Sequence, residues 1–251
     1  MNQSCSVFLP AVVLALALAA VPSVRADLVL ETETAELGKK GELTLSAGVQ
    51  FERERDGSRT TFTLNQFEYA ITDRAEILIE PFFREWDRPK GEKSFHGMGD
   101  LEITPSYMLI EDQGGWAPAV VLALKVKVPT AKNRDIGTGK FDYYPYFIFG
   151  KKYGNWVFNV NLGYNFINSP AGEGLKNQFI YDLSVERILT PKWSVFAEIF
   201  GNSSASPGER PTFAGAVAAE YHFTETKAAF LSVGYDTDHL ANIRPGLTFS
   251  F

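Results

Sequence analysis

Apolar and polar side chains alternate along almost the whole chain after Gly41. In the stretch 156–166, every second residue is Trp, Phe, Val, Leu or Tyr, and the residues between them are mostly Asn and Gly. A period of two is typical of β-strands with one apolar and one polar face, and no long stretch after Gly41 shows the 3.6-residue period of an amphipathic helix. We therefore predict an all-β fold.

The alternating runs can be counted, and they give about twelve strands of a single antiparallel sheet. We place them near residues 41–54, 60–71, 75–86, 97–110, 117–129, 139–150, 156–167, 177–188, 193–202, 212–223, 227–236 and 241–251. Phe67 and Phe196 do not fit, because both fall on the face that is otherwise polar.

The connections between these runs differ in length in a regular way. Alternate ones are short and polar, at 72–74, 113–115, 153–155, 190–192 and 224–226. Most of the others are longer and rich in Gly, Pro, Ser, Asn and charge, at 87–96, 130–138, 168–176 and 201–211. Short turns on one side, long loops on the other and an even strand number are typical of outer-membrane barrels.

A soluble β-sandwich would also alternate, so the placement of rings and charges decides between the two folds. Aromatic residues make up 14% of the chain, and they gather near strand ends, where a lipid-facing band would have its two girdles. Charges of both signs lie at mid-strand on the opposite face, where hydrocarbon would make them costly but a wet lumen would not. We predict an up-and-down transmembrane β-barrel in the outer membrane of a Gram-negative bacterium, with both termini periplasmic.

Five prolines within the predicted strands argue against this fold. Each removes a backbone N–H that a closed barrel needs for its ladder. They are Pro81, Pro105, Pro118, Pro145 and Pro245. All five lie on the apolar face, which allows bulges or strand ends at these positions.

The first residues have the pattern of an export signal. An apolar run at 7–21 precedes the small-residue pattern Val24-Arg25-Ala26, so we predict a cleaved signal peptide at 1–26. Residues 27–40 are then a periplasmic lead-in, too short for a plug domain, and 41–251 form the barrel. The single cysteine, Cys5, lies in the predicted signal peptide, so the mature chain has no thiol chemistry.

A set of charged residues falls on the predicted lumen face of the strands. It comprises Glu76, Glu80, Arg84, Lys125, Lys127, Asp182, Glu186, Glu198, Glu220 and Arg244. These side chains either pair with each other and fill a narrow barrel, or line a constriction that sets solute preference. The small excess of acid favours cations or neutral solutes over anions.

Several other functions are disfavoured. A net charge of -6 and a pI of about 5.2 give no basic surface for nucleic acid. The glycine pairs at 97/99 and 137/139 match no phosphate-binding loop, and the three histidines form no metal-ligand pair. His222 and His239 could approach Ser232 or Ser250, but no motif marks either serine as a nucleophile. We expect no enzyme activity, no cofactor and no metal.

Three motifs carry a resemblance to a known family. They are 96–107 (HGMGDLEITPSY), 123–130 (ALKVKVPT) and 137–142 (GTGKFD), continued by 159–164 (NVNLGY). The mature chain, from 31–35 (ETETA) to Phe251, resembles the outer-membrane transporter-like family named after the meta-pathway of phenol degradation. The resemblance implies a barrel that helps small, often aromatic or hydrophobic, compounds to cross the envelope.

The last residues, Phe249-Ser250-Phe251, resemble the C-terminal signal of outer-membrane barrels, which implies that Phe249 and Phe251 are read by the barrel-assembly machinery. The expected partners are outer-membrane lipid, this machinery, periplasmic chaperones and a small solute. We predict a channel for passive passage of small solutes. The alternative is a closed structural or adhesive barrel whose surface loops bind a partner.

Overall fold

The structure is a computed structural model that describes residues 29–81, 84–206 and 208–251. In these residues it has fourteen antiparallel strands and no helix long and apolar enough to cross a membrane. The strands are β1 (Leu43–Arg53), β2 (Arg59–Thr72), β3 (Ala75–Glu80), β4 (Arg84–Arg88), β5 (Phe95–Met98), β6 (Leu101–Ile110), β7 (Ala119–Val128), β8 (Asp142–Tyr153), β9 (Trp156–Asn165), β10 (Gln178–Thr190), β11 (Trp193–Asn202), β12 (Thr212–Thr224), β13 (Lys227–Asp236) and β14 (Ala241–Ser250).

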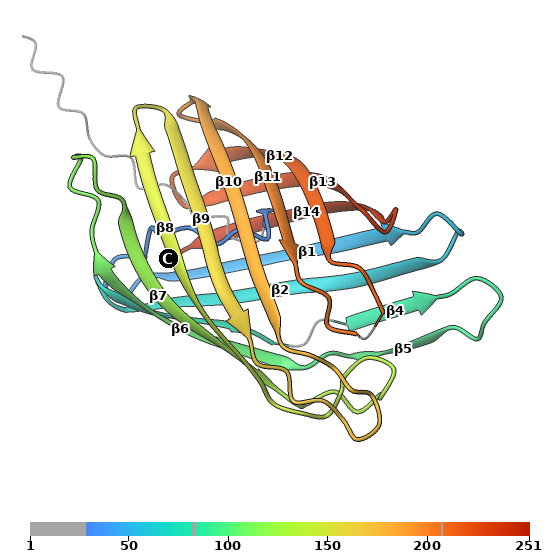
Figure 1. The fold of residues 1–251 in the computed structure, drawn as a ribbon. Coiled ribbons are helices and arrows are strands. Elements are labelled where there is room, and N and C mark those ends of the chain that lie inside the picture. Colours follow the sequence, from blue (N-terminus) through green and yellow to red (C-terminus); the bar gives the residue numbers. More distant parts are fainter. Residues whose placement is uncertain (1–28, 82–83, 207) are drawn as a thin grey trace, which may run out of the picture.

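The sheet closes on itself, because β1 pairs with both β2 and β14 (Figure 1). β3 and β4 both pair with β2 and together make one strand of the wall. Their partners β5 and β6 make the next one, because β4 pairs with β5 and β3 with β6. The described wall is thus a closed barrel of twelve antiparallel strands, which confirms the predicted fold.

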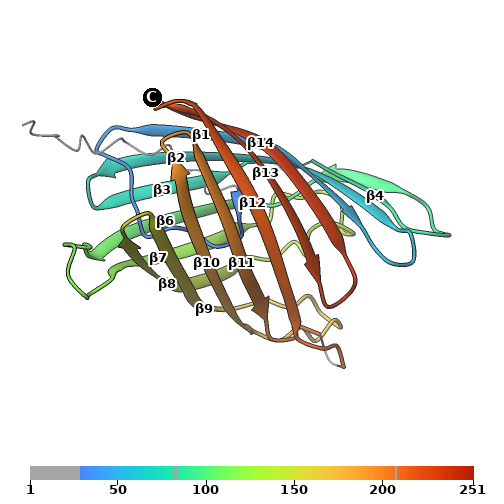
Figure 2. The same ribbon diagram turned by 90° about the horizontal axis from the view of Figure 1, so that it is seen from above.

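The two ends of the barrel differ as predicted. Tight turns at 154–155, 191–192 and 225–226 lie at one end, and the longer connections 129–141 and 166–177 lie at the other. At the loop end the hairpin of β4 and β5 extends beyond most of the wall, and the hairpin of β1 and β2 extends beside it (Figures 1 and 2). Leu43 and Phe251 exchange backbone hydrogen bonds of 3.2 and 2.9 Å, so the barrel domain begins and ends at the short-turn end.

One face of each strand carries exposed side chains on the outside of the barrel, and the other face carries side chains enclosed in the lumen. On β7, Leu122 and Leu124 point outward and are 40% and 38% exposed, whereas Val121 and Ala123 point inward and are at most 1% exposed. Phe67 is 42% exposed and so lies on the outer face, where an aromatic residue is expected. Exposed large apolar side chains recur on the outer face of most strands, as in a surface that faces lipid.

The prolines interrupt the ladder without opening the barrel. Pro81 falls in the break between β3 and β4, and Pro118 directly precedes β7. Pro105, Pro145 and Pro245 keep their pairing with one neighbouring strand, at Ile77, Leu124 and Leu231. On the other side of each proline, two consecutive residue pairs are missing from the ladder. The affected ladders are β6–β7 for Pro105, β8–β9 for Pro145 and β1–β14 for Pro245. A missing N–H thus removes the pairing on one side only.

Phe249 and Phe251 belong to the closing strand β14 and its end. Phe251 is 72% exposed, and Phe249 opposes Leu45 of β1. Their role as an assembly signal stays a prediction.

Candidate functional site

Residues 29–40 enter the barrel instead of leading up to it from outside. The segment starts beside inner-wall residues of β12 and β13 and reaches β1 at the short-turn end. Figure 1 shows it in blue behind the wall formed by β8, β9 and β10. Val29, Thr32 and Ala35 are at most 4% exposed. The prediction of a periplasmic lead-in therefore needs correction for the described part of this segment, and the predicted signal peptide lies outside the described residues.

Side chains of the wall bind the backbone of this segment, which we call the lumen segment (residues 29–38). The Glu198 carboxylate accepts hydrogen bonds from the backbone N–H of Glu31 at 3.0 Å and of Thr32 at 3.1 Å. Asn159 Oδ1 accepts from Ala35 N at 3.2 Å, and Glu76 from Gly38 N at 2.9 Å. Because this irregular segment inside the barrel has no strand to pair with, these acceptors satisfy donors that would otherwise be unpaired.

Asn161 adds a two-point contact on the same backbone. In the amide orientation that satisfies its neighbours, its nitrogen donates to Glu33 O at 3.0 Å and its oxygen accepts from Glu33 N at 2.7 Å. The side-chain amide thus pairs with both backbone polar groups of Glu33, as the backbone of a neighbouring strand would.

Ion pairs reinforce these contacts from two sides of the wall. Arg244 donates to the Glu31 carboxylate and to Gln50 Oε1, and its guanidinium also reaches Leu30 O at 3.4 Å. Glu33 accepts a hydrogen bond from the Tyr146 hydroxyl and lies 4.0 Å from Lys125 Nζ. Since β14 and β8 lie far apart around the barrel, the segment bridges opposite parts of the wall.

The first apolar contact lies at the start of the segment. Val29 and Leu30 pack against Phe230 and Ala218, with Phe196 beside them. Phe196 therefore points into the lumen, which explains why its position conflicts with an all-polar inner face. Burial of these side chains adds a hydrophobic contribution to docking.

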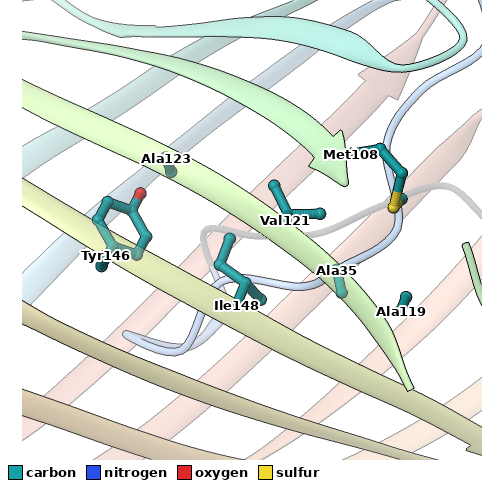
Figure 3. Close-up of a cluster of buried hydrophobic side chains, with 7 residues drawn as sticks. All are labelled: Ala35, Met108, Ala119, Val121, Ala123, Tyr146 and Ile148. Atoms are coloured by element: carbon teal, nitrogen blue, oxygen red, sulfur yellow. The ribbon is translucent and has the colours of Figure 1, made fainter. Parts of the chain in front are cut away.

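A second apolar contact lies closer to the short-turn end. Ala35 sits among inward-facing side chains of β6, β7 and β8, which are Met108, Ala119, Val121, Ala123, Tyr146 and Ile148 (Figure 3). Leu37 packs against the same group. The lumen wall is thus apolar where Ala35 and Leu37 dock, a feature that the sequence analysis missed although β7 is apolar on both faces.

Gly150 permits the close approach of the segment to β8. A Cβ at this position would lie 2.5 Å from Ala35 Cβ and 3.0 Å from Asn159 Oδ1, the acceptor of the Ala35 N–H. We predict that Gly150→Val displaces the segment and raises the conductance of single channels in planar bilayers. Gly115→Val is the control, since no heavy atom lies within 4 Å of a Cβ there. Equal currents from both variants would mean that Gly150 does not seat the segment.

Nine of the ten predicted lumen residues face the interior. Glu186 accepts a hydrogen bond from Ser194 at 2.6 Å, and Glu220 lies 3.3 Å from His222 Nε2. The other seven line the cavity or contact the lumen segment or its neighbours, and they are Glu76, Glu80, Lys125, Lys127, Asp182, Glu198 and Arg244. Their role in selectivity stays a prediction.

Arg84 is the exception, and its predicted place in the lumen is wrong. It is exposed, and its guanidinium lies 5.2 Å from the Trp86 ring centroid. The register on β2 shifts by one residue between the Phe67–Ile79 and Phe62–Glu85 pairs. This shift turns odd-numbered residues of β4 inward, so Arg84 faces outward.

Two lysines organise the acids of the lumen. Lys125 Nζ lies 3.0 Å from Glu80 and 3.3 Å from Glu102, in addition to its contact with Glu33. Lys127 pairs with Asp142 and lies 3.9 Å from Asp100. Lys125 thus holds carboxylates of the neighbouring strands β3 and β6 and one of the lumen segment, and Lys127 links Asp142 of β8 to Asp100, which precedes β6.

A cavity of about 330 Å³ lies at the loop end of the lumen. Glu31 and Glu33 of the lumen segment form part of its lining. Its wall is contributed by Glu102, Lys125, Lys127, Asp142, Tyr144, Tyr146, Asn161, Asn165, Ile180, Asp182, Phe200, Gly201 and Asn202. It is therefore a polar vestibule with a few aromatic surfaces, and the lumen segment lies next to it on the way through the barrel.

Residues considered for catalysis are not assembled into a reactive site. His239 contacts Tyr235 at 2.8 Å, and Ser250 contacts Thr44 at 3.0 Å. His222 is placed beside Glu220, as described above. Within the described residues, no group of three or more His, Cys, Asp or Glu side chains could hold a metal ion.

Comparison with known proteins identifies the family of this chain. A family model described as "Putative MetA-pathway of phenol degradation" matches residues 26–251. The chain belongs to this family. No curated protein matches it.

Several solved structures share the fold of this family member. The chain is similar to the COG4313 outer membrane channel from Pseudomonas putida F1, with a TM-score of 0.70 at 14% identity over 86% of this chain and 98% of that one. For the NanC porin the TM-score is 0.61 at 11% identity, over 82% of this chain and 98% of that one. For the translocator domain of the autotransporter NalP from Neisseria meningitidis the TM-score is 0.54 at 11% identity, over 85% of this chain and 90% of that one. At these identities the likeness concerns the fold alone.

Proposed function

We propose that this protein is an outer-membrane channel for the passive passage of small solutes, and that the lumen segment narrows it in the conformation described. The outer face supports a membrane location. It carries exposed large apolar side chains on every side of the closed wall. Rings such as Trp193 and Tyr221, 4.8 Å apart, gather near the short-turn end, as an interfacial aromatic girdle does.

The observation that carries the proposal is the charged cavity inside a closed wall. A barrel of twelve strands is intermediate between small barrels filled by side chains and wide porins, so it has room for a narrow pore. The lumen segment fills part of this room without belonging to the wall. It is an irregular chain held by side chains, and such a chain can shift without breaking any strand pairing.

The class of solute is inferred from the comparisons and from the lining of the vestibule. The structural neighbour from Pseudomonas putida is an outer membrane channel, and the family is named for phenol degradation. Both support small organic solutes, aromatic ones among them. The aromatic surfaces of the vestibule, Tyr144, Tyr146 and Phe200, suit such solutes, and the remaining polar lining suits their hydroxyl or charged groups.

A closed structural or adhesive barrel remains the second candidate. The lumen segment favours it, because the segment contacts several sides of the wall through both ion pairs and apolar side chains. In this reading the long loops bind a partner. In either reading the protein interacts with lipid and with the assembly machinery and chaperones of the envelope, and it is not an enzyme.

Ion preference tests the channel proposal. Lys125→Ala with Lys127→Ala removes two positive charges from a lumen that keeps its carboxylates, so we expect the reversal potential under a salt gradient to shift toward cation selectivity. The measurement uses protein purified from outer membranes and reconstituted in planar bilayers.

The matched control is Lys140→Ala with Lys176→Ala, which removes two exposed lysines of the long loops. It should leave the reversal potential unchanged. If both pairs of substitutions shift the potential equally, the current does not pass the lumen lysines, and a folded protein that carries no current favours the structural alternative.

A further inference from the structure

Asp182 differs from the other carboxylates of the vestibule. Its side chain is 9% exposed, and it lines the cavity. Glu31, Glu33, Glu102 and Asp142 are each paired with an arginine or a lysine. Asp182, in contrast, has no hydrogen bond or ion pair with any described residue. A buried carboxylate without a partner is costly, which makes it a strong attachment point for a ligand that supplies the missing charge or donor.

A second unsatisfied polar group belongs to the same cavity. The Tyr144 hydroxyl is enclosed and has no hydrogen-bond partner in the described residues. The Tyr144 ring lies over Gly163 of β9, where a Cβ would collide with it. β9 separates β8 from β10, so the ring extends across β9 in the direction of the strand that carries Asp182. The lining of the vestibule thus contains both an unpaired carboxylate and an enclosed, unpaired hydroxyl oxygen.

The surrounding charges and surfaces define the ligand class. Five carboxylates and two lysines line the cavity, so its lining is acidic and favours a cation. Tyr144 and Tyr146 stack with ring centroids 4.5 Å apart, and Phe200 provides a further ring. Stacked rings are suited to the apolar body of a ligand and to the face of a cation.

We propose that the vestibule binds small organic cations that carry a primary ammonium group on an apolar or aromatic body, with Asp182 as the counter-ion and the Tyr144 hydroxyl as a second acceptor. This inference rests on the proposed function in so far as the vestibule lies on the solute route. Asp182 is then the residue that favours binding of amines over neutral aromatics of the same size.

The test is calorimetric titration of the detergent-solubilised full protein with 2-phenylethylammonium at pH 7. The matched neutral probe is 2-phenylethanol. We expect saturable binding of the ammonium compound, and a dissociation constant raised by about tenfold or more in Asp182→Asn, because the charge-assisted hydrogen bond is lost. Tyr144→Phe should weaken binding by a smaller factor.

Glu173→Gln is the control, since Glu173 is an exposed carboxylate of the loop between β9 and β10. Heat-dependent migration on gels shows whether each variant is a folded barrel. Equal affinity of the wild type and Asp182→Asn, or equal affinity for the ammonium and the alcohol, would overturn the inference. Binding without any bilayer current would support the site and refute the channel, whereas current without binding would refute the site alone.

Discussion

Removing the lumen segment is expected to raise the single-channel conductance of the protein several-fold. The segment crosses the lumen and is held from β3, β9, β11 and β14, so its loss frees the cross-section of the barrel. The wall should remain intact, because its strand pairing begins at Leu43, after the segment. The change is deletion of residues 29–37, and the measurement is the size of current steps in planar bilayers at fixed voltage.

A second variant distinguishes the effect of chain filling the lumen from the effect of its attachment to the wall. Replacing residues 29–37 with a Gly/Ser sequence of the same length keeps chain in the lumen but removes both ionic and apolar anchors. We expect long open periods interrupted by brief closures as the loose chain re-enters the pore. If both variants conduct like the wild type, the segment does not restrict the pore.

Replacing Lys125 should have the largest effect on stability. Its ammonium group lies within 4.0 Å of Glu33, Glu80 and Glu102, and its side chain is only 25% exposed. In Lys125→Met three carboxylates lose their shared cation, which should lower the free energy of unfolding by on the order of 3 kcal/mol. Urea titration of the protein in lipid vesicles measures this change.

Lys140→Met provides the comparison, because Lys140 is exposed in the loop before β8. Adding Glu80→Gln and Glu102→Gln to Lys125→Met should recover most of the lost stability, since neutral amides need no counter-charge. A Lys125→Met protein that unfolds at the same urea concentration as Lys140→Met would show that the three contacts contribute little.

The barrel could be predicted from the sequence because its signal is local and repeated. Each strand carries its own alternation of side chains, and the turn lengths assign the two ends. The register of β4 could not be predicted, because a one-residue shift between the pairs that β2 makes with β3 and with β4 reverses the facing of every residue in β4. Arg84 was misplaced for this reason.

The lumen segment was missed for a different reason. Its docking depends on contacts between residues far apart in the sequence, such as Glu31 with Arg244 and Thr32 with Glu198. Two local signs of it were present. Phe196 lay on the wrong face for a wet lumen, and Val121 lay among inward positions that polar residues would otherwise occupy. Apolar residues on the inner face of a barrel indicate that something inside covers them.

The central claim, that this family member is a channel restricted by its own lumen segment, is tested most directly by single-channel recording of the full protein and of the 29–37 deletion side by side. The account predicts discrete small steps for the full protein and larger steps for the deletion. A deletion protein that migrates as a folded barrel and remains electrically silent would contradict it.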